Sequence, residues 1–271
     1  MEFELKKASS EVRINILKMI NKGGSSHIAS AFSCVDILVS LYGKILNTTP
    51  SNINDIDRDY FVMSKGHAGA AVYATLARFG FFDDEDLSGH YQNGTRLSGH
   101  VSHVGINGVE FSTGSLGHGL PYACGLALSA RIDNRNSRVY CLNSDGEMGE
   151  GSNWEAILFA SHHGLDNLCL LIDRNKLQSI KGTEDTLKLE PLWQKFEAFG
   201  WEVKLVNGHC HSDIEEACLA APNGCPRVVI CDTIKGKGVS FMENTVEWHY
   251  KTPKDNLFEA ALNELELSSC E

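Results

Sequence analysis

Apolar residues recur along the chain in short runs that predict helices and strands in turn. In the first half, the spacing predicts helices over residues 8–19 and 34–46 and a short buried strand over residues 60–63. Residues 82–109 are rich in glycine, histidine and asparagine and follow no period. A long irregular stretch inside a compact domain is usually functional, so this segment is a candidate for site loops.

The second half alternates more regularly. Strands are predicted over residues 139–142, 168–172, 203–206 and 228–231, with helices from about residue 153 and near residues 193–199, and a helical period follows Asp255. Strands that alternate with helices indicate an α/β fold, a mostly parallel sheet with helices on both faces. We therefore predict a single α/β domain over residues 1–271 that ends in a helix.

Composition and charge narrow the function classes. The chain has 271 residues, 42% of them hydrophobic, which is enough for a sizeable core. The 35 acidic and 24 basic side chains give a net charge of −11, which disfavours nucleic acid and anionic membranes as partners. No apolar run has the length of a membrane span, and Glu2 and Glu4 stand where a leader would be basic and apolar. Nine cysteines without a C-x-x-C pair fit reduced thiols, so we expect a soluble protein of the cytoplasm.

Two polar residues follow neighbouring predicted strands. Asp145 comes just after the strand near residue 140, and Asn175 comes just after the next strand, thirty residues further on. Because the carboxyl ends of parallel strands meet at one edge of a sheet, we expect these side chains to lie close together. Carboxylate and amide oxygens suit Mg²⁺ or Ca²⁺, and Mg²⁺ needs few protein ligands when phosphates complete its shell.

Either residue alone is more often an ordinary turn or loop residue. Together, however, Asp145 and Asn175 favour a ligand-binding site. Two further features support it: Gly146 and Gly149 allow a close backbone approach, and an apolar stripe begins just behind them at Trp154.

This region resembles the thiamine diphosphate motif, in which G-D-G is followed about thirty residues later by an asparagine. The likeness to the N-terminal section of a split transketolase extends over nearly the whole chain. It is carried by Ser64-Lys65-Gly66-His67, Ser98-Gly99-His100, residues 112–119, residues 144–156 and 173–177, residues 235–244 and Glu247-Trp248-His249.

The resemblance implies a thiamine diphosphate-binding fold with a bound divalent metal. It implies that Asp145, Asn175 and the main-chain carbonyl of Leu177 hold Mg²⁺, or Ca²⁺ or Mn²⁺ in its place. The residues it places at the cofactor are His67, Gly114, Ser115, Leu116, Gly146, Glu147, Asn175 and His249.

The activity that the resemblance implies is transfer of a two-carbon ketol unit from a ketose, or ketose phosphate, to an aldose. By analogy, His27 and His249 assist proton transfer at the sugar hydroxyls, and His100 contacts the carbonyl end of the donor. Histidine suits such work because it exchanges a proton near neutral pH.

Several other residues have an ordinary interpretation. We expect structural or surface roles for His90, His103, His162, His163, His209 and His211. The pairs His100/His103 and His209/His211 lack the further ligands that a zinc site needs. Lys65, Lys235 and Lys237 are candidates for offsetting phosphate charge, although Lys235 and Lys237 fit a solvated face equally well.

Three positions depart from the family pattern. Ser144 stands where a glycine is expected, and a positive φ there would cost roughly 1–2 kcal/mol. Residues 26–30 around His27 are bulkier than the usual glycine-rich neighbours, and His118 stands where many relatives have glutamine. The identity of donor and acceptor is therefore open.

Transketolases also need a pyrimidine-binding domain, whose glutamate contacts the cofactor ring, and a C-terminal domain. We find neither in this chain and expect a second polypeptide to supply the missing half, in a heterotetramer with two copies of each chain. Glu150 and Glu155 match family carboxylates that face this interface, although Glu155 is equally well an acidic residue favoured by a helix dipole. The alternatives are another thiamine-dependent synthase or decarboxylase, and a non-catalytic scaffold or regulatory subunit that kept the fold.

Overall fold

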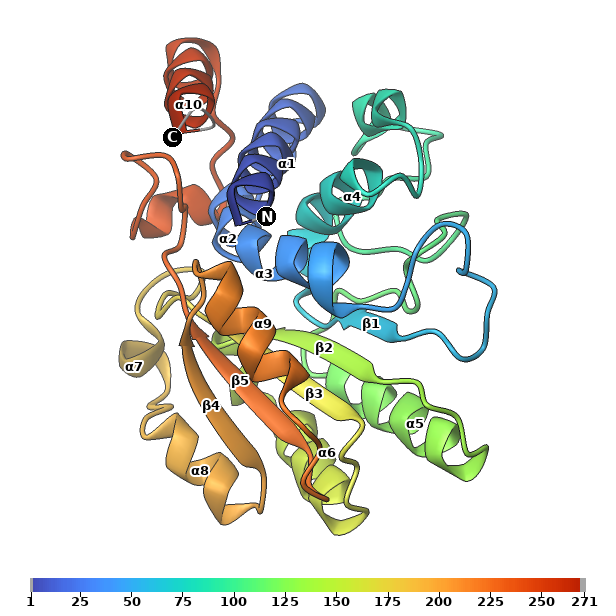
Figure 1. Ribbon diagram of the computed structural model, residues 1–271. Helices are drawn as coiled ribbons and strands as arrows, with labels where there is room; N and C mark the ends of the chain where they lie inside the picture. The colour runs from blue at the N-terminus through green and yellow to red at the C-terminus, as the bar shows by residue number, and fades with distance from the viewer. Residues whose placement is uncertain (1, 269–271) are drawn as a thin grey trace.

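The structure, a computed structural model, describes residues 2–268; Met1 and the last three positions of the predicted 1–271 unit lie outside the described residues. Its five strands form one fully parallel sheet in the order β1-β2-β3-β5-β4 (Figure 1). The strands are β1 (Tyr60–Met63), β2 (Val139–Ser144), β3 (Leu168–Arg174), β4 (Glu202–Asn207) and β5 (Arg227–Asp232). The predicted α/β class and parallel sheet are confirmed.

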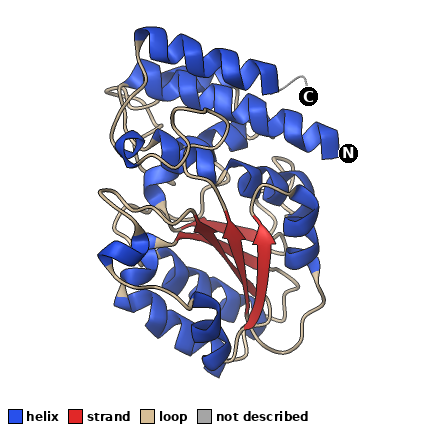
Figure 2. Cartoon of the chain, turned by 90° about the vertical axis from the view of Figure 1, so that its left-hand side faces the viewer, coloured by secondary structure: helices blue, strands red, loops and turns tan. Residues whose placement is uncertain are grey.

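Helices cover both faces of this sheet (Figure 2). One face carries α1 (Glu2–Gly23), α2 (Ile28–Ser33), α3 (Val35–Ser40), α4 (Gly69–Arg78), α9 (His211–Leu219) and α10 (Asp255–Ser268). The other carries α5 (Gly119–Ile132), α6 (Gly151–His162) and α8 (Leu192–Ala198), and the short α7 (Thr183–Thr186) lies in the connection after β3. Short turns of other helix types are the π-helix Leu41–Ile45 and the 3₁₀ turns Gly66–Ala68, Asp84–Gly89, Gly146–Gly149 and Val246–His249. None of the helices within residues 2–268 is long and apolar enough to cross a bilayer.

The strands divide the apolar core into two clusters. Along β2, Tyr140 and Leu142 belong to the cluster under α1–α4, whereas Val139 and Cys141 belong to the cluster under α5 and α6. Successive side chains of a strand point to opposite faces, so a strand buried on both sides reads as a continuous apolar run. This is why β1, β2, β3 and β5 were visible in the sequence as apolar runs, whereas the edge strand β4 is partly exposed.

The helices were harder to predict. The run over residues 34–46 is a six-residue helix followed by a π-helical turn, and α1 begins at Glu2 rather than near residue 8. The helices α2, α4, α5, α7 and α9 were not predicted. The helix α5 is apolar around most of its circumference, so it shows no amphipathic stripe, and α2, with six residues, is too short for one.

A buried ion pair joins two helices on the larger face. The guanidinium of Arg13 (α1) donates to both carboxylate oxygens of Asp36 (α3) at 3.1 and 2.6 Å, and the ring of His209 also bonds to Asp36 at 2.7 Å. Burial alone would raise the pKa of Asp36, but the charge of Arg13 and the bond to His209 hold the pKa below its ordinary value.

We expect Asp36→Ala to lower the free energy of unfolding by about 3–5 kcal/mol, because Arg13 would stay buried without a counter-charge. Urea unfolding measures the change. Glu11→Ala is the control: its ion pair with Arg78 leaves both side chains 37% exposed and should contribute less than about 1 kcal/mol. Equal losses in the two variants would contradict this interpretation.

Candidate functional site

A cavity of about 260 Å³ lies at the carboxyl edge of the sheet. Its walls include nearly all of the expected site residues: His27, His67, His100, Gly114, Leu116, Asp145, Gly146, Glu147, Asn175, Leu177 and His249. Ser115 is the exception: it is solvent-exposed and does not line the cavity. The structure therefore brings together residues from segments more than 200 positions apart in the sequence.

An ion pair between Lys65 and Asp173 forms the floor of this region, and both side chains are fully buried. Lys65 follows β1, and its ammonium also donates to the carbonyl of Ser30 at 2.9 Å. Asp173 lies in β3 and accepts bonds from the hydroxyls of Ser33, at 2.5 Å, and Thr233. Burial alone would raise the pKa of Asp173, but Lys65 and these hydroxyls lower the pKa overall. The sequence interpretation of Lys65 as a phosphate partner needs correction, since its charge is already paired.

Asp173 also fixes the orientation of Asn175. The amide nitrogen of Asn175 donates to the Asp173 carboxylate at 3.3 Å. The amide oxygen therefore points the other way, where it accepts a bond from the backbone N–H of Leu177 at 3.1 Å. This oxygen is the atom that a hard cation would use.

Asp145 stands beside Asn175 because β2 and β3 pair in register, with Ser144 opposite Asp173. One oxygen of Asp145, Oδ2, accepts bonds from the Arg174 guanidinium at 2.9 Å and from the N–H of Lys176 at 2.6 Å. The other oxygen, Oδ1, accepts the N–H of Gly146 at 2.7 Å. Burial and the nearby Asp173 raise the pKa of Asp145, and Arg174 partly offsets this rise.

Lys235 supplies a second buried cation. Its ammonium donates to the carbonyls of Leu177 and Gln178 at 3.0 and 2.9 Å and to Nδ1 of His249 at 3.0 Å. Burial and the charge of Lys65 lower the pKa of Lys235 to about 8. Lys235 is therefore part of the cavity wall. Lys237, the other lysine of the motif at residues 235–244, is partly exposed.

Four histidine rings meet at the mouth of the site. The ring centroid of His27 lies 5.4 Å from that of His67, 5.6 Å from that of His100 and 5.0 Å from that of His249. Burial, followed by neighbouring positive charges, lowers the pKa of His27 to about 4 and that of His249 to about 3, and it lowers the pKa of His67 as well. These three rings are therefore neutral at pH 7 and can both donate and accept hydrogen bonds.

Glu147 lines the cavity, but its carboxylate is used within the protein. It accepts bonds from the hydroxyl of Ser64 at 2.5 Å and from the backbone N–H groups of Gly117 and Ser144 at 2.9 and 3.2 Å. A Cβ on Gly119 would clash with the side chain of Ser64, which shows how closely these loops approach. Glu147 thus holds two site loops together.

The structure explains how two of the departures from the family pattern, Ser144 and the segment around His27, are accommodated. Ser144 is the last residue of the extended strand β2, so no glycine is required there. The left-handed backbone conformation occurs instead at His27, with φ of 74°, where the chain enters α2. The hydroxyl of Ser26 bonds to Nδ1 of His27 at 3.0 Å, so the bulkier segment also orients this ring.

Four of the histidines outside the site make internal bonds, and one of the four, His103, bonds from an exposed position to the hydroxyl of Ser112 at 2.6 Å. His90 pairs with Ser25 at 3.0 Å, His211 with Ser40 at 2.8 Å and His209 with Asp36, in agreement with structural roles. His103, His162 and His163 are exposed.

Sequence reasoning missed Asp173 and Arg174 as parts of the site. The predicted strand ended at Ile172, and two charged residues directly after a fully apolar run were the available signal. It also missed Tyr250, whose ring stands 4.7 Å from that of His249 at the cavity wall.

Comparison with known proteins decides the family. The family model described as transketolase, thiamine diphosphate binding domain, matches residues 5–265. The chain belongs to the transketolase family.

Two relatives have nearly the same length as this transketolase-family chain. It is 42% identical to an apulose-4-phosphate transketolase subunit of Actinobacillus succinogenes, over 97% of this chain and 96% of that protein. It is 36% identical to a 6-deoxy-6-sulfo-D-fructose transketolase subunit of a Clostridium species, over 98% and 97%. The crystal structure of transketolase from Campylobacter jejuni superposes with a TM-score of 0.91 and 28% identity, and this chain spans 45% of its length.

The residues of this transketolase-family site fit a metal diphosphate. Asp145 Oδ1, the oriented Asn175 oxygen and the Leu177 carbonyl are hard oxygen donors on one wall. The histidine rings supply N–H groups that suit phosphate oxygens, and the charge of the Lys235 ammonium lies beside them. A cavity with these two donor sets accommodates an anion bridged to the protein by a cation.

The low pKa of His249 predicts a pH-dependent stability. The unfolded histidine takes up a proton near pH 6.5, whereas the folded ring stays neutral to about pH 3. The contribution of His249 to the free energy of unfolding is therefore complete above pH 6.5 and is lost as the pH falls toward 3. Between pH 7 and pH 5 this one ring should reduce the free energy of unfolding by up to about 2 kcal/mol.

Urea unfolding of the chain at the two pH values, compared with His249→Gln, measures this contribution. The variant should show a flatter dependence, and His162→Gln, at an exposed position of α6, should follow the wild type. An unchanged slope in His249→Gln would contradict the assignment.

Proposed function

We propose that this chain is the thiamine diphosphate-binding subunit of a split transketolase and transfers a two-carbon ketol unit from a sugar donor to an aldose acceptor. The observation that carries the proposal is the convergence of Asp145, Asn175 and the Leu177 carbonyl on the cavity that also holds four histidines. The relatives named as transketolase subunits support it.

Thiamine diphosphate, when bound, supplies the stabilisation of the two-carbon carbanion that ketol transfer requires. Asp145, Asn175 and Leu177 hold Mg²⁺, for which Ca²⁺ or Mn²⁺ can substitute. Gly146, His67 and His249 approach the diphosphate, and Gly114, Ser115 and Leu116 line the side of the aminopyrimidine ring. Glu147 acts indirectly through Ser64 and the loop at Gly117.

The histidines move protons at the sugar. Nδ1 of His249 accepts a hydrogen bond from the Lys235 ammonium, so the neutral ring carries its proton on Nε2 and can donate it to a hydroxyl or carbonyl oxygen. His27 stands 5.0 Å away, centroid to centroid, on the path to His100. This arrangement suits His27 and His249 to proton exchange at hydroxyls and His100 to contact with the donor carbonyl.

The proposed enzyme acts as a heteromer in the cytoplasm. A second polypeptide that carries the pyrimidine-binding domain completes the cofactor site, in an assembly with two copies of each chain. Glu150 and Glu155 are exposed beside the site and are placed to face this partner. Relatives that match this chain over almost their whole length are named as subunits, which supports a separate partner chain.

The substrate belongs to a specialised carbohydrate class. The names of the relatives specify apulose-4-phosphate for two of them and 6-deoxy-6-sulfo-D-fructose for a third. We propose a donor sugar that carries a phosphate or sulfonate at the end remote from the transferred carbons.

The decisive assay combines the purified chain with its pyrimidine-domain partner, thiamine diphosphate and Mg²⁺, and measures ketol transfer from phosphorylated and sulfonated donors. We expect turnover by the pair and none by either chain alone, because each holds only part of the cofactor site. Turnover by the isolated chain would contradict the split site. A pair that binds the cofactor without any turnover would favour the scaffold alternative.

Asp145→Asn should weaken Mg²⁺-dependent binding of thiamine diphosphate by more than about 100-fold, because the cation loses its charged protein ligand. Isothermal titration calorimetry of the assembled pair measures the affinity. Asp133→Asn, at an exposed position after α5, is the matched control and should bind as the wild type does. Unchanged affinity in Asp145→Asn would show that the metal lies elsewhere.

A further inference from the structure

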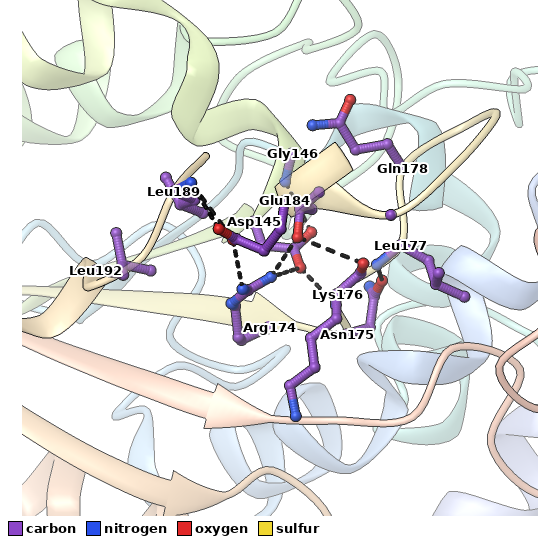
Figure 3. Close-up of polar contacts among 12 residues, drawn as sticks. Asp145, Gly146, Arg174, Asn175, Lys176, Leu177, Gln178, Glu184, Leu189 and Leu192 are labelled. Atoms are coloured by element: carbon purple, nitrogen blue, oxygen red, sulfur yellow. Dashed lines mark hydrogen bonds and ion pairs between the residues drawn. The ribbon is translucent and has the colours of Figure 1, made fainter. Parts of the chain in front are cut away.

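Arg174 is a buried arginine at the end of β3, directly before the metal-binding segment (Figure 3). Its guanidinium makes five hydrogen bonds, as many as it has N–H groups. Nη1 donates to Asp145 at 2.9 Å and to the hydroxyl of Thr183 at 2.7 Å. Nη2 donates to Glu184 at 3.0 Å, and both Nη2 and Nε donate to Glu190, at 2.9 and 3.1 Å.

The outer part of this network fixes the connection that covers one side of the site, residues 178–191. The carboxylate of Glu184 accepts the backbone N–H of Leu189, and that of Glu190 accepts the N–H of Leu192 at 2.8 Å. The two glutamates thereby link the guanidinium of Arg174 to the backbone of the segment through hydrogen bonds. Their side chains are nearly half-exposed, and Arg174 is the buried group that both carboxylates bond to.

The inner part of the network constrains Asp145. Arg174 and the N–H of Lys176 both donate to Oδ2, which uses the two lone pairs of that oxygen. Within residues 2–268, Oδ1 has one hydrogen-bond partner, the N–H of Gly146, and so keeps a free lone pair. Arg174 therefore selects the oxygen that remains available to a cation.

We propose that Arg174 is a positioning residue that couples metal binding to the order of residues 178–191. Arg174 holds Asp145 through Oδ2, so that Oδ1 is free to bind the cation. The same guanidinium also holds Glu184 and Glu190, which fix the backbone of residues 178–191. This inference rests on the proposed function, because it takes Asp145 as the Mg²⁺ ligand. Coupling is reciprocal, so Mg²⁺ should order the segment and an ordered segment should favour Mg²⁺.

The direction in which Mg²⁺ affinity changes when Arg174 is removed separates a positioning role from a simple charge effect. A positive guanidinium beside the metal ligand repels Mg²⁺, so removing its charge alone would strengthen Mg²⁺ binding. Removing a positioning residue would weaken binding, because Asp145 would lose its orientation. The sign of the change in affinity therefore decides between the two roles.

The test uses the assembled pair with saturating thiamine diphosphate. Calorimetric titration with Mg²⁺ gives the affinity, and hydrogen exchange read by mass spectrometry gives the protection of residues 178–191 before and after Mg²⁺. The variants are Arg174→Met, Arg174→Lys and the double variant Glu184→Gln/Glu190→Gln. Arg227→Met is the control, since Arg227 is a second buried arginine, paired with Glu202 on the strand edge away from Asp145.

We expect Arg174→Met to bind Mg²⁺ about tenfold more weakly and to exchange faster over residues 178–191, with partial recovery in Arg174→Lys. The double glutamine variant should lose both protection and, by about threefold or more, Mg²⁺ affinity, although neither glutamate reaches the metal site. Arg227→Met should leave both readouts as in the wild type.

Tighter Mg²⁺ binding by Arg174→Met would overturn the inference, as would unchanged affinity in both Arg174→Met and the double variant. A double variant that loses protection but keeps its Mg²⁺ affinity would show that the two events are independent, which also overturns it. A wild-type pair that does not bind Mg²⁺ with thiamine diphosphate would instead contradict the proposed function itself.

Discussion

The site is organised around a charge pair that is buried at the carboxyl edge of the sheet. Lys65 and Asp173 are both inaccessible to solvent, and each charge would be costly to bury without the other. Their bonds connect the end of β1, the end of β3, the helix α2 and the segment after β5. Four segments that are distant in sequence are thus fixed relative to one another before any ligand is bound.

The orientation of the oxygens that we propose as metal ligands follows from this pair. Asp173 takes the amide nitrogen of Asn175, which leaves the Asn175 oxygen for a cation, and the pairing of β2 with β3 sets Asp145 beside it. The cavity is lined by two buried lysines and four histidine rings, although the whole chain carries a charge of −11. Under the proposed function, local groups and a divalent metal would hold a diphosphate against the overall field of the protein.

The sequence was informative where chemistry coincides with the end of an apolar strand. Asp145 and Asn175 were predictable because both follow buried strands, and in a parallel sheet such positions share one edge. The helix α5 was not predictable, since it is apolar on most sides and shows no stripe. The role of Glu147 and the network of Arg174 depend on loops that approach through space, and no local pattern encodes those contacts.

We propose that this edge of the sheet holds a metal diphosphate between Asp145, Asn175 and Leu177. The most direct test is an anomalous difference map from crystals of the assembled pair grown with thiamine diphosphate and Mn²⁺, recorded at the manganese edge. We predict one strong peak within coordination distance of Asp145 Oδ1, the Asn175 amide oxygen and the Leu177 carbonyl, with the diphosphate on its open side. A cofactor seen in the crystal with the manganese peak away from these three oxygens would show that the metal is held elsewhere.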